Sequence, residues 1–352
     1  MPRKEILKIS FPLYSLFGGA AYDFSTIKNG DLFLSYPQNF NDPFDGAILI
    51  DQNEFTKEFL TRRFDERFVS IASSELQKHK SLDIFSLIDQ YNFTRSSAPY
   101  GLPLYSDECS IFADIDTAKL KEEIAILYDS YIREIKKVRD EYGVACFTAN
   151  APQHNMVMWA HYANNYRGFC CEFVFDYYDA DTIRDTKGTS NVLRHFHRVI
   201  YTKSFLFLNV KKLLDIPVEE LHKNKYIHRF IERVLTLKHK QWNYENEYRI
   251  IIHKDSSHFK KVFDKNNKGF KISFPYLNAL YLDFAKCIDD TSIEDIASKY
   301  KIKYYGLTAS PNGVTLVEDK SIINSHNILL DSERILQMFS LSAPMEKETL
   351  PF

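Results

Sequence analysis

The segment from Trp242 to Ile252 places two glutamates, Glu245 and Glu247, at the start of an apolar run rich in β-branched residues. Such a run favours a strand, and residues two apart in a strand project to the same side. We therefore expect both carboxylates on one face, where a cation, a donor or a substrate must offset their repulsion. The structural alternative is an edge strand whose solvated acids pair with Arg249 or nearby lysines.

The chain of 352 residues has globular composition, with 45% hydrophobic and 26% charged residues. Its 28 Phe and 22 Tyr predict an aromatic core or a cleft lined by rings. The formal net charge of −2 argues against a strongly electrostatic nucleic-acid binder, although it leaves room for a local basic patch.

The five cysteines are an odd number and show neither a CxxC pair nor the spacing of a zinc finger. The first ten residues lack the long apolar stretch of a signal peptide, and no run of about 18 apolar residues indicates a membrane span. We expect a reduced, cytoplasmic protein with free thiols and no membrane contact.

Hydrophobic periodicity predicts helices within residues 54–95 and 115–140, and hence a helical insertion at about 54–140. Irregular alternation of elements elsewhere indicates an α+β fold with a mixed or antiparallel sheet. Further helices are predicted at 20–27, 154–166 and 217–241, and a helix with a polar tail is predicted at 320–352. Strands are predicted at 11–16, 32–36, 144–148, 168–175, 199–201, 278–284, 304–307 and 313–318.

The predicted helix 154–166 carries a second group of candidate residues. His161 is suited to orient a ligand or to act as an acid or base, and Trp159 and Tyr162 are suited to stack on a flat ring such as nicotinamide or adenine. His154 lies two turns from His161, but no third ligand has the spacing of a metal site, so no metal is expected. A core helix with ordinary aromatic packing is the alternative.

Polar residues at loops and strand ends give further candidates. Asn41 and Asp42 follow a strand in a turn-forming run, where they suit ligand binding or an Asx turn. Thr148 ends a strand, and its hydroxyl suits either a ribose or phosphate contact or a helix cap. The basic residues of 217–241 suit phosphate binding or a solvated helix face.

Three segments together resemble one family. Residues 40–44, 158–170 and 242–249 contain the patterns NDPF, WxHYAxxxxGFC and WxYExEYR. Their order and spacing resemble the prokaryotic domain-of-unknown-function family numbered 2971, whose members often lie near phage-defence or mobile genes. The resemblance spans roughly residues 11–310 and does not itself supply a reaction.

The order of the predicted strands is also similar, more distantly, to the split sheet of NAD-dependent ADP-ribosyltransferases. This similarity implies one ADP-ribosyltransferase-like domain over residues 1–319 that includes the helical insertion, with NAD as substrate. It implies that Glu247 stabilises a ribosyl cation, that Glu245 serves the acceptor, and that Thr148 stands near the family's Ser-Thr-Ser position. Tyr14 and Ser15 replace the Arg or His by which the first strand of such enzymes holds NAD.

The resemblance implies that His161 or Arg249 takes over this NAD contact, or that the fold binds another ligand. It further implies a nicotinamide pocket lined by His161 and Tyr162, with Asn41 and Asp42 at its floor. The expected protein is a toxin or effector of phage defence or abortive infection, with a protein or nucleic-acid acceptor and a defence-system partner or antitoxin.

Two other functions remain open from the sequence. One is a sensor without catalytic activity, whose cleft binds a nucleotide or a phage component. The other is a nuclease in which Asp42, Asp45, Glu245 and Glu247 converge on Mg²⁺.

Overall fold

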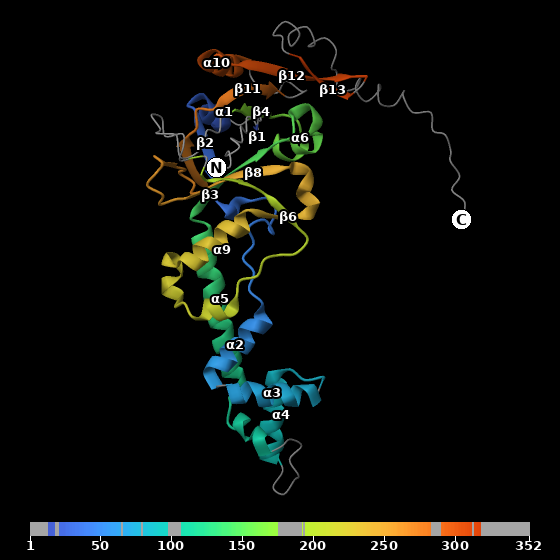
Figure 1. Cartoon of the computed structure of the whole chain (residues 1–352), viewed down its shortest axis with the longest axis vertical. Helices are drawn as coiled ribbons and strands as arrows, with labels where there is room; N and C mark the ends of the chain where they lie inside the picture. Colours follow the sequence, from blue (N-terminus) through green and yellow to red (C-terminus); the bar gives the residue numbers. More distant parts are fainter. Residues whose placement is uncertain are drawn as a thin grey trace, which may run out of the picture.

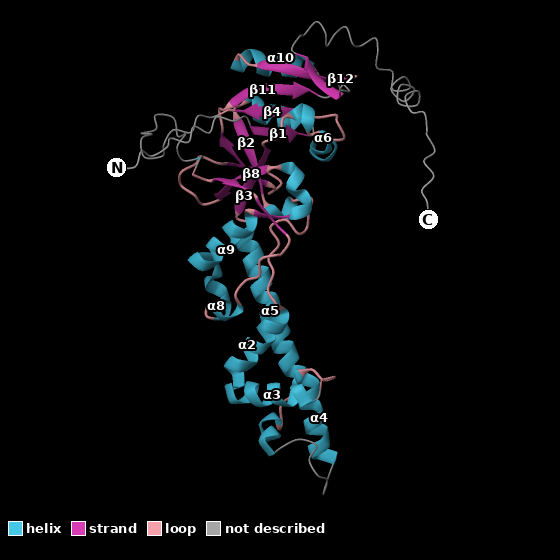
Figure 2. Ribbon diagram, turned by 45° about the vertical axis from the view of Figure 1, so that its right-hand side comes forward, coloured by secondary structure: helices cyan, strands magenta, loops and turns pink. Residues whose placement is uncertain are grey.

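The computed structural model describes residues 13–17, 21–64, 66–78, 80–97, 107–174, 192, 194–282, 290–311 and 313–317. These residues form a sheet-rich head and a long helical stalk that extends from it (Figures 1 and 2). The stalk contains α2 (Gln52–Phe64), α3 (Glu66–Lys78), α4 (Ile84–Ser97), α5 (Thr117–Arg139), α8 (Val210–Leu214) and α9 (Lys225–Leu235), with 3-10 helices at Asp107–Phe112 and Val218–Lys223.

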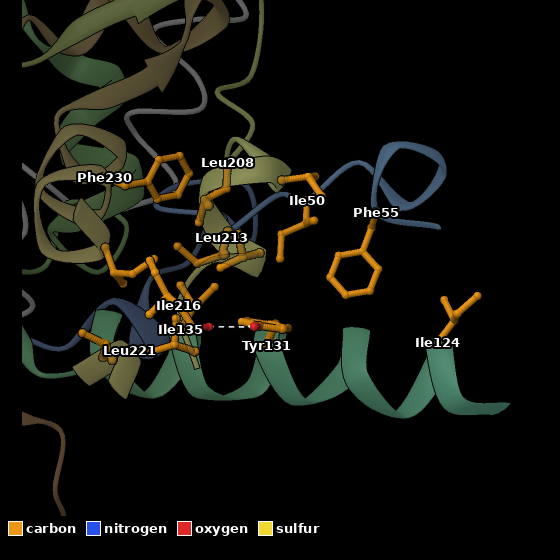
Figure 3. Close-up of a cluster of buried hydrophobic side chains, with 14 of the residues drawn as sticks. Ile50, Phe55, Ile124, Tyr131, Ile135, Leu208, Leu213, Ile216, Leu221 and Phe230 are labelled. Carbon is orange, nitrogen blue, oxygen red and sulfur yellow. Dashed lines mark hydrogen bonds between the residues drawn. The ribbon is translucent and has the colours of Figure 1, made fainter. Parts of the chain in front are cut away.

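The stalk is built around α5, whose N-terminus is capped because the Asp116 side chain accepts a hydrogen bond from the Lys119 amide at 3.0 Å. Apolar side chains of α5 recur every three or four residues and pack against α2, α8 and α9. Figure 3 shows this stalk core, in which the Tyr131 hydroxyl donates to the Ile216 carbonyl oxygen at 2.7 Å. The labelled members of the stalk core are Ile50, Phe55, Ile124, Tyr131, Ile135, Leu208, Leu213, Ile216, Leu221 and Phe230.

The head is a mixed sheet in the order β13-β12-β11-β4-β1-β3-β2-β10-β9, with β8 paired to β3 and β5 paired to β8. All neighbours are antiparallel except β11 and β12, which are parallel. The strands are β1 (Leu13–Phe17), β2 (Asp31–Ser35), β3 (Tyr142–Thr148), β4 (Phe169–Phe173), β5 (Phe196–Arg198), β8 (Glu247–His253), β9 (Val262–Phe263), β10 (Gly269–Ser273), β11 (Leu277–Leu282), β12 (Lys303–Ser310) and β13 (Gly313–Val317).

Shorter elements surround this sheet. Strands β6 and β7 pair in parallel as a separate two-stranded sheet close to the stalk. Their bounds, with those of the remaining helices, are β6 (Ile200–Thr202), β7 (Leu237–His239), α1 (Ala21–Lys28), α6 (Met156–Tyr162), α10 (Asp290–Tyr300), and 3-10 helices at Pro37–Asn39, Pro152–His154 and Lys240–Glu245.

The sheet splits along one edge of β3. Strand β8 pairs with β3 over its whole length, from Tyr142 to Thr148. On the other edge, β1 is joined only where Tyr14 lies opposite Thr148, and β2 only where Ser35 lies opposite Val144. The two neighbours therefore diverge from β3, and the side chains of β3 between them can line a cleft.

The predicted α+β class and the mixed sheet are confirmed, and so are the helices predicted within 54–95 and 115–140. The single helix predicted over 217–241 is wrong, because Asn224 interrupts it, α9 ends at Leu235, and a strand and a 3-10 helix follow. The helix predicted to reach residue 166 ends at Tyr162.

Several elements of the structure were not predicted. They are the 3-10 helix at Asp107–Phe112, the strands β5, β9 and β10, and the helices α8 and α10. Residues 320–352, predicted as a helix and a tail, lie outside the described residues. Among the described helices, none is long and apolar enough to cross a membrane.

Candidate active site

A cleft of about 430 Å³ opens where the sheet splits. One wall is formed by β2 and the loop that follows it, and another by the C-terminal end of α6. The floor is formed by β3. Residues that line the cleft include Phe33, Phe40, Asn41, Asp45, Cys146, Thr148, Met158, His161, Tyr162, Lys238, Glu245 and Glu247.

The two glutamates reach this cleft from different backbone settings. Glu245 is the last residue of the 3-10 helix Lys240–Glu245, not a strand residue, so the prediction that both glutamates occupy one strand is wrong. Asn246 follows with a φ of 45°, a left-handed conformation that Asn tolerates, and reverses the chain so that β8 begins at Glu247. The Thr148 hydroxyl donates to the Glu245 carbonyl oxygen at 2.6 Å and fixes this turn to the end of β3.

The two carboxylates nevertheless meet at Lys238 of β7. Its ammonium nitrogen lies 2.5 Å from Glu245 Oε2 and 3.0 Å from Glu247 Oε2. It also lies 3.5 Å from Asp45 Oδ2 and 5.1 Å from the centre of the Trp242 ring. Lys238 thus supplies the cation that the carboxylate pair requires, and its side chain is only 5% exposed.

Arg249 supplies the second cation. Its guanidinium forms a bidentate pair with Asp45 at 2.8 and 2.6 Å and contacts Glu247 at 2.7 and 3.1 Å. A further N–H group donates to the Leu235 carbonyl at the end of α9. Asp45, Lys238, Glu245, Glu247 and Arg249 form a buried group of three acids and two bases, which we call the site cluster.

The site cluster shifts the pKa values of its two glutamates in opposite directions. Burial raises the pKa of Glu245, and Lys238 offsets this only in part. Burial acts in the same sense on Glu247, but Arg249 and Lys238 outweigh it and hold the pKa of Glu247 at about 2. Glu247 is therefore a permanent anion at neutral pH, and Glu245 is the better proton acceptor of the two.

Neighbouring side chains fix these carboxylates. The Tyr162 hydroxyl donates to Glu245 Oε1 at 2.7 Å, and the Glu247 amide donates to the Tyr201 hydroxyl oxygen at 2.9 Å. The Cys146 thiol is exposed to the cleft and hydrogen-bonds to Glu247; desolvation by the surrounding protein, together with the charge of Glu247, raises the pKa of this thiol.

The structure brings most of the residues expected from the sequence to the cleft. Asn41, Thr148, His161 and Tyr162 line it. His161 is exposed there, and its ring centre lies 6.2 Å from that of Trp242.

Other expected residues lie elsewhere. Trp159 is completely buried, donates to the Pro152 carbonyl oxygen at 3.0 Å, and does not line the cleft, so its predicted stacking on a ligand ring is not available. Asp42 accepts a hydrogen bond from the Phe44 amide at 2.9 Å, which is the Asx-turn alternative. Tyr14 and Ser15 lie on β1, with their side chains outside the described residues.

The sequence reasoning missed Lys238, Tyr201 and Cys146. Lys238 follows a helix in a short basic run and gave no signal that set it apart from its exposed neighbours. Cys146 could have been found, because it stands two residues before Thr148 on the same face of a predicted strand. The described residues hold no group of three or more His, Cys, Asp or Glu side chains arranged to bind a metal ion.

Comparison with known proteins gives one match. A family model described as "Protein of unknown function (DUF2971)" matches residues 158–250, in agreement with the family resemblance drawn from the sequence patterns. The matched stretch contains Lys238, Glu245, Glu247 and Arg249 but not Asp45. No curated protein and no solved structure matches the chain.

Proposed function

We propose that the cleft binds NAD and that the protein breaks the bond between nicotinamide and ribose, then passes ADP-ribose to an acceptor or to water. One observation carries this proposal. Glu245 and Glu247 share Lys238 but have opposite pKa shifts, which assigns one carboxylate to charge stabilisation and the other to proton transfer.

Glu247 suits the first step. When the C1′–N bond breaks, its electron pair leaves with nicotinamide, and a positive charge develops on the ribose. A carboxylate that is already ionised and held in place stabilises this cation without reorganising. Arg249 and Lys238 hold Glu247 in that state, and Glu247 lines the cleft.

Glu245 suits the second step. The acceptor's hydroxyl or amine, or a water molecule, bonds to C1′ and must release a proton. Glu245 suits the role of proton acceptor because burial raises its pKa above the ordinary value, and Lys238 and Tyr162 orient its two oxygens.

The cleft fits the rest of NAD. Its volume lies within the usual range of cofactor sites, about 300–1,000 Å³. Phe40, Met158 and Tyr162 offer apolar and ring surfaces for nicotinamide, and the Asn41 amide offers hydrogen bonds for its carboxamide. The divergence of β1 and β2 from β3 also supports an ADP-ribosyltransferase-like split sheet.

NAD turnover by the purified protein, with and without cell lysate as acceptor, tests the proposal. We expect Glu247→Gln to lower turnover about 10²–10³-fold, because it removes the fixed charge at the developing cation. Glu245→Gln should also lower turnover, by about 10²-fold, through the lost proton acceptor. Release of nicotinamide is read by mass spectrometry.

Glu172→Gln is the matched control. Glu172 is another buried head carboxylate, which accepts from the Tyr281 hydroxyl at 2.5 Å and lies outside the cleft. Only variants with wild-type circular dichroism at the assay temperature are compared. Wild-type turnover by both glutamate variants contradicts the proposal, as does the absence of turnover by the wild type under every condition.

The internal pairing of the acids favours a second candidate, a nucleotide-binding sensor without catalytic activity. Asp45 and Glu247 both form buried ion pairs with Arg249. These ion pairs are equally compatible with a site that binds a nucleotide without reacting with it. NAD binding in calorimetry without consumption, unchanged in Glu247→Gln, would support the sensor. The nuclease hypothesis is weaker, since a metal ion must displace Lys238 and Arg249 from these oxygens.

In the cell, a protein with the proposed activity would act as a toxin or effector of phage defence. Expression of the wild type in a bacterial host should then slow growth and deplete cellular NAD, whereas Glu247→Gln should do neither. Normal growth with normal NAD at equal expression contradicts that role.

A further inference from the structure

Three aromatic rings lie in a row beside the site cluster. The Phe44 and Phe205 ring centres are 5.7 Å apart, and the Phe205 ring stacks on His239 with centres 6.1 Å apart. Phe44 is 61% exposed and Phe205 43% exposed. Both rings line a small pocket that shares Lys238 with the cleft, so this ring platform (Phe44, Phe205 and His239) adjoins the candidate active site.

The segment that supplies two of these rings is strongly basic. Residues 201–241 carry nine Lys or Arg side chains against four Asp or Glu side chains, in a chain whose formal net charge is −2. Every one of the nine except Lys238 is exposed, and none of these eight forms an ion pair within the described part of the chain. Such an excess of unneutralised charge favours an anionic partner.

Part of this charge forms a stripe that leads to the platform. Lys225, Arg229 and Arg233 are spaced four residues apart in α9 and therefore lie on one face of the helix. Helix α9 stands where the stalk meets the head (Figures 1 and 2). The buried Val234, which follows Arg233 in the chain, lines the pocket of the ring platform, so the C-terminal end of α9 lies beside this pocket.

We propose that single-stranded nucleic acid binds along the exposed face of α9 and stacks a base on the ring platform. Exposed flat rings accept any base, and cations beside them track the phosphates. An acidic protein or an anionic membrane can also neutralise the lysines and arginines, but a nucleic acid adds flat bases that stack on the exposed rings, which favours nucleic acid. The idea that such a strand also accepts ADP-ribose rests on the proposed function, whereas the idea that it binds here does not.

Fluorescence anisotropy with labelled 15-nucleotide single-stranded DNA and RNA of mixed sequence tests the binding. We expect the wild-type affinity to fall as salt rises, because phosphate contacts release counterions. Phe44→Ala with Phe205→Ala should weaken binding roughly five- to a hundredfold, the range for losing one stacked base, with little change in the salt slope.

Arg229→Ala with Arg233→Ala should reduce the salt slope by about 1.4, since each lost phosphate contact on a single strand contributes about 0.7. Lys119→Ala with Lys136→Ala is the matched control, because it removes two exposed lysines from α5. Absence of binding at about 50 mM salt, or equal weakening by the control pair, overturns the inference. Tighter binding to anionic vesicles or to an acidic peptide, insensitive to the ring variants, also overturns it.

The outcome separates this inference from the proposed function. Glu247→Gln should bind the oligonucleotide as the wild type does, because the Glu247 side chain is buried and does not line the pocket of the ring platform. Suppose that the wild type binds the oligonucleotide but never consumes NAD, and that the ring variant loses this binding. The nucleic-acid surface is then supported and the proposed function fails. A mass increase of one ADP-ribose on the oligonucleotide, absent with Glu247→Gln, supports both.

Discussion

The stalk core and the site cluster are both buried, but they are filled in opposite ways. The stalk core consists of apolar side chains, and the hydrogen bond drawn among them in Figure 3 is from the Tyr131 hydroxyl to the Ile216 carbonyl oxygen. The site cluster contains five ionised or ionisable side chains, of which Arg249 is completely buried. Both regions are therefore buried, but only the site cluster is filled with charged side chains.

This difference indicates what each region is for. Apolar burial stabilises a fold by about 25 cal/mol per Å². Burying ion pairs costs several kcal/mol of desolvation per ion, and apolar replacements of whole clusters are often as stable or more so. Stability explains the stalk core. It does not explain the site cluster, whose charges line a cleft, and this is the physical reason for assigning chemistry to the cluster.

The largest expected effect is from Arg249→Met. The variant leaves Asp45, Glu245 and Glu247 with Lys238 as their only cation in the cluster, so we expect unfolding free energy to fall by about 3–5 kcal/mol. Trp159 and Trp242 both lie in the head, which makes tryptophan fluorescence during urea unfolding a probe of this region.

Arg229→Met is the matched control, because Arg229 is exposed on α9 and its loss should change the unfolding free energy by less than about 0.5 kcal/mol. A loss below about 1 kcal/mol for Arg249→Met would mean that the cluster's charges are solvated in solution. In that case the contrast with the stalk core disappears.

The next largest effect is expected on the stability of the folded chain at low pH. The pKa of Glu247 is about 2 in the folded chain against an ordinary 4.5, so its ionisation stabilises the folded state above pH 4.5. That contribution is lost as the pH falls from 4.5 to about 2, and it amounts to at most about 3 kcal/mol. The raised pKa of Glu245 acts in the opposite sense and reduces the net loss.

The measurement is the urea midpoint of head unfolding at pH 7, 4 and 3, in wild type and in Glu247→Gln. The wild-type advantage over the variant should shrink as the pH falls, because the unfolded wild type takes up a proton at Glu247 below about pH 4.5, whereas the folded wild type keeps this carboxylate ionised down to about pH 2. If the urea midpoints of wild type and Glu247→Gln differ by the same amount from pH 7 to pH 3, the Glu247 carboxylate lies outside the ion-pair network.

The same contrast explains how much the sequence could predict. The stalk helices within residues 54–95 and 115–140 follow from local periodicity, since the apolar positions of α5 are encoded at fixed spacing. The meeting of Glu245 and Glu247 was expected from the sequence, but for the wrong reason. They do not share a strand; the left-handed turn at Asn246 and the hydrogen bond from Thr148 bring them together.

The remainder of the site depends on contacts between distant segments. Asp45 reaches Arg249 across 204 residues, and nothing in the local sequence distinguishes Lys238 from the exposed lysines near it. The failure of the helix predicted over 217–241 has the same cause. Within it, Leu237–His239 are held as β7 by pairing with β6, a tertiary contact that overrides a helical pattern.

The smallest effect is expected in the stalk core, from Tyr131→Phe. The variant keeps the ring and removes the hydroxyl that donates to the buried Ile216 carbonyl, which should cost about 1 kcal/mol. Burial raises the pKa of Tyr131, so the hydroxyl stays protonated and the loss should be the same at pH 7 and pH 3. Urea unfolding followed by circular dichroism at 222 nm reports on this helical region. A loss that varies between pH 7 and pH 3 would show that Tyr131 is energetically coupled to a titrating side chain, and the stalk core would then have to be compared with the site cluster by double-mutant cycles instead.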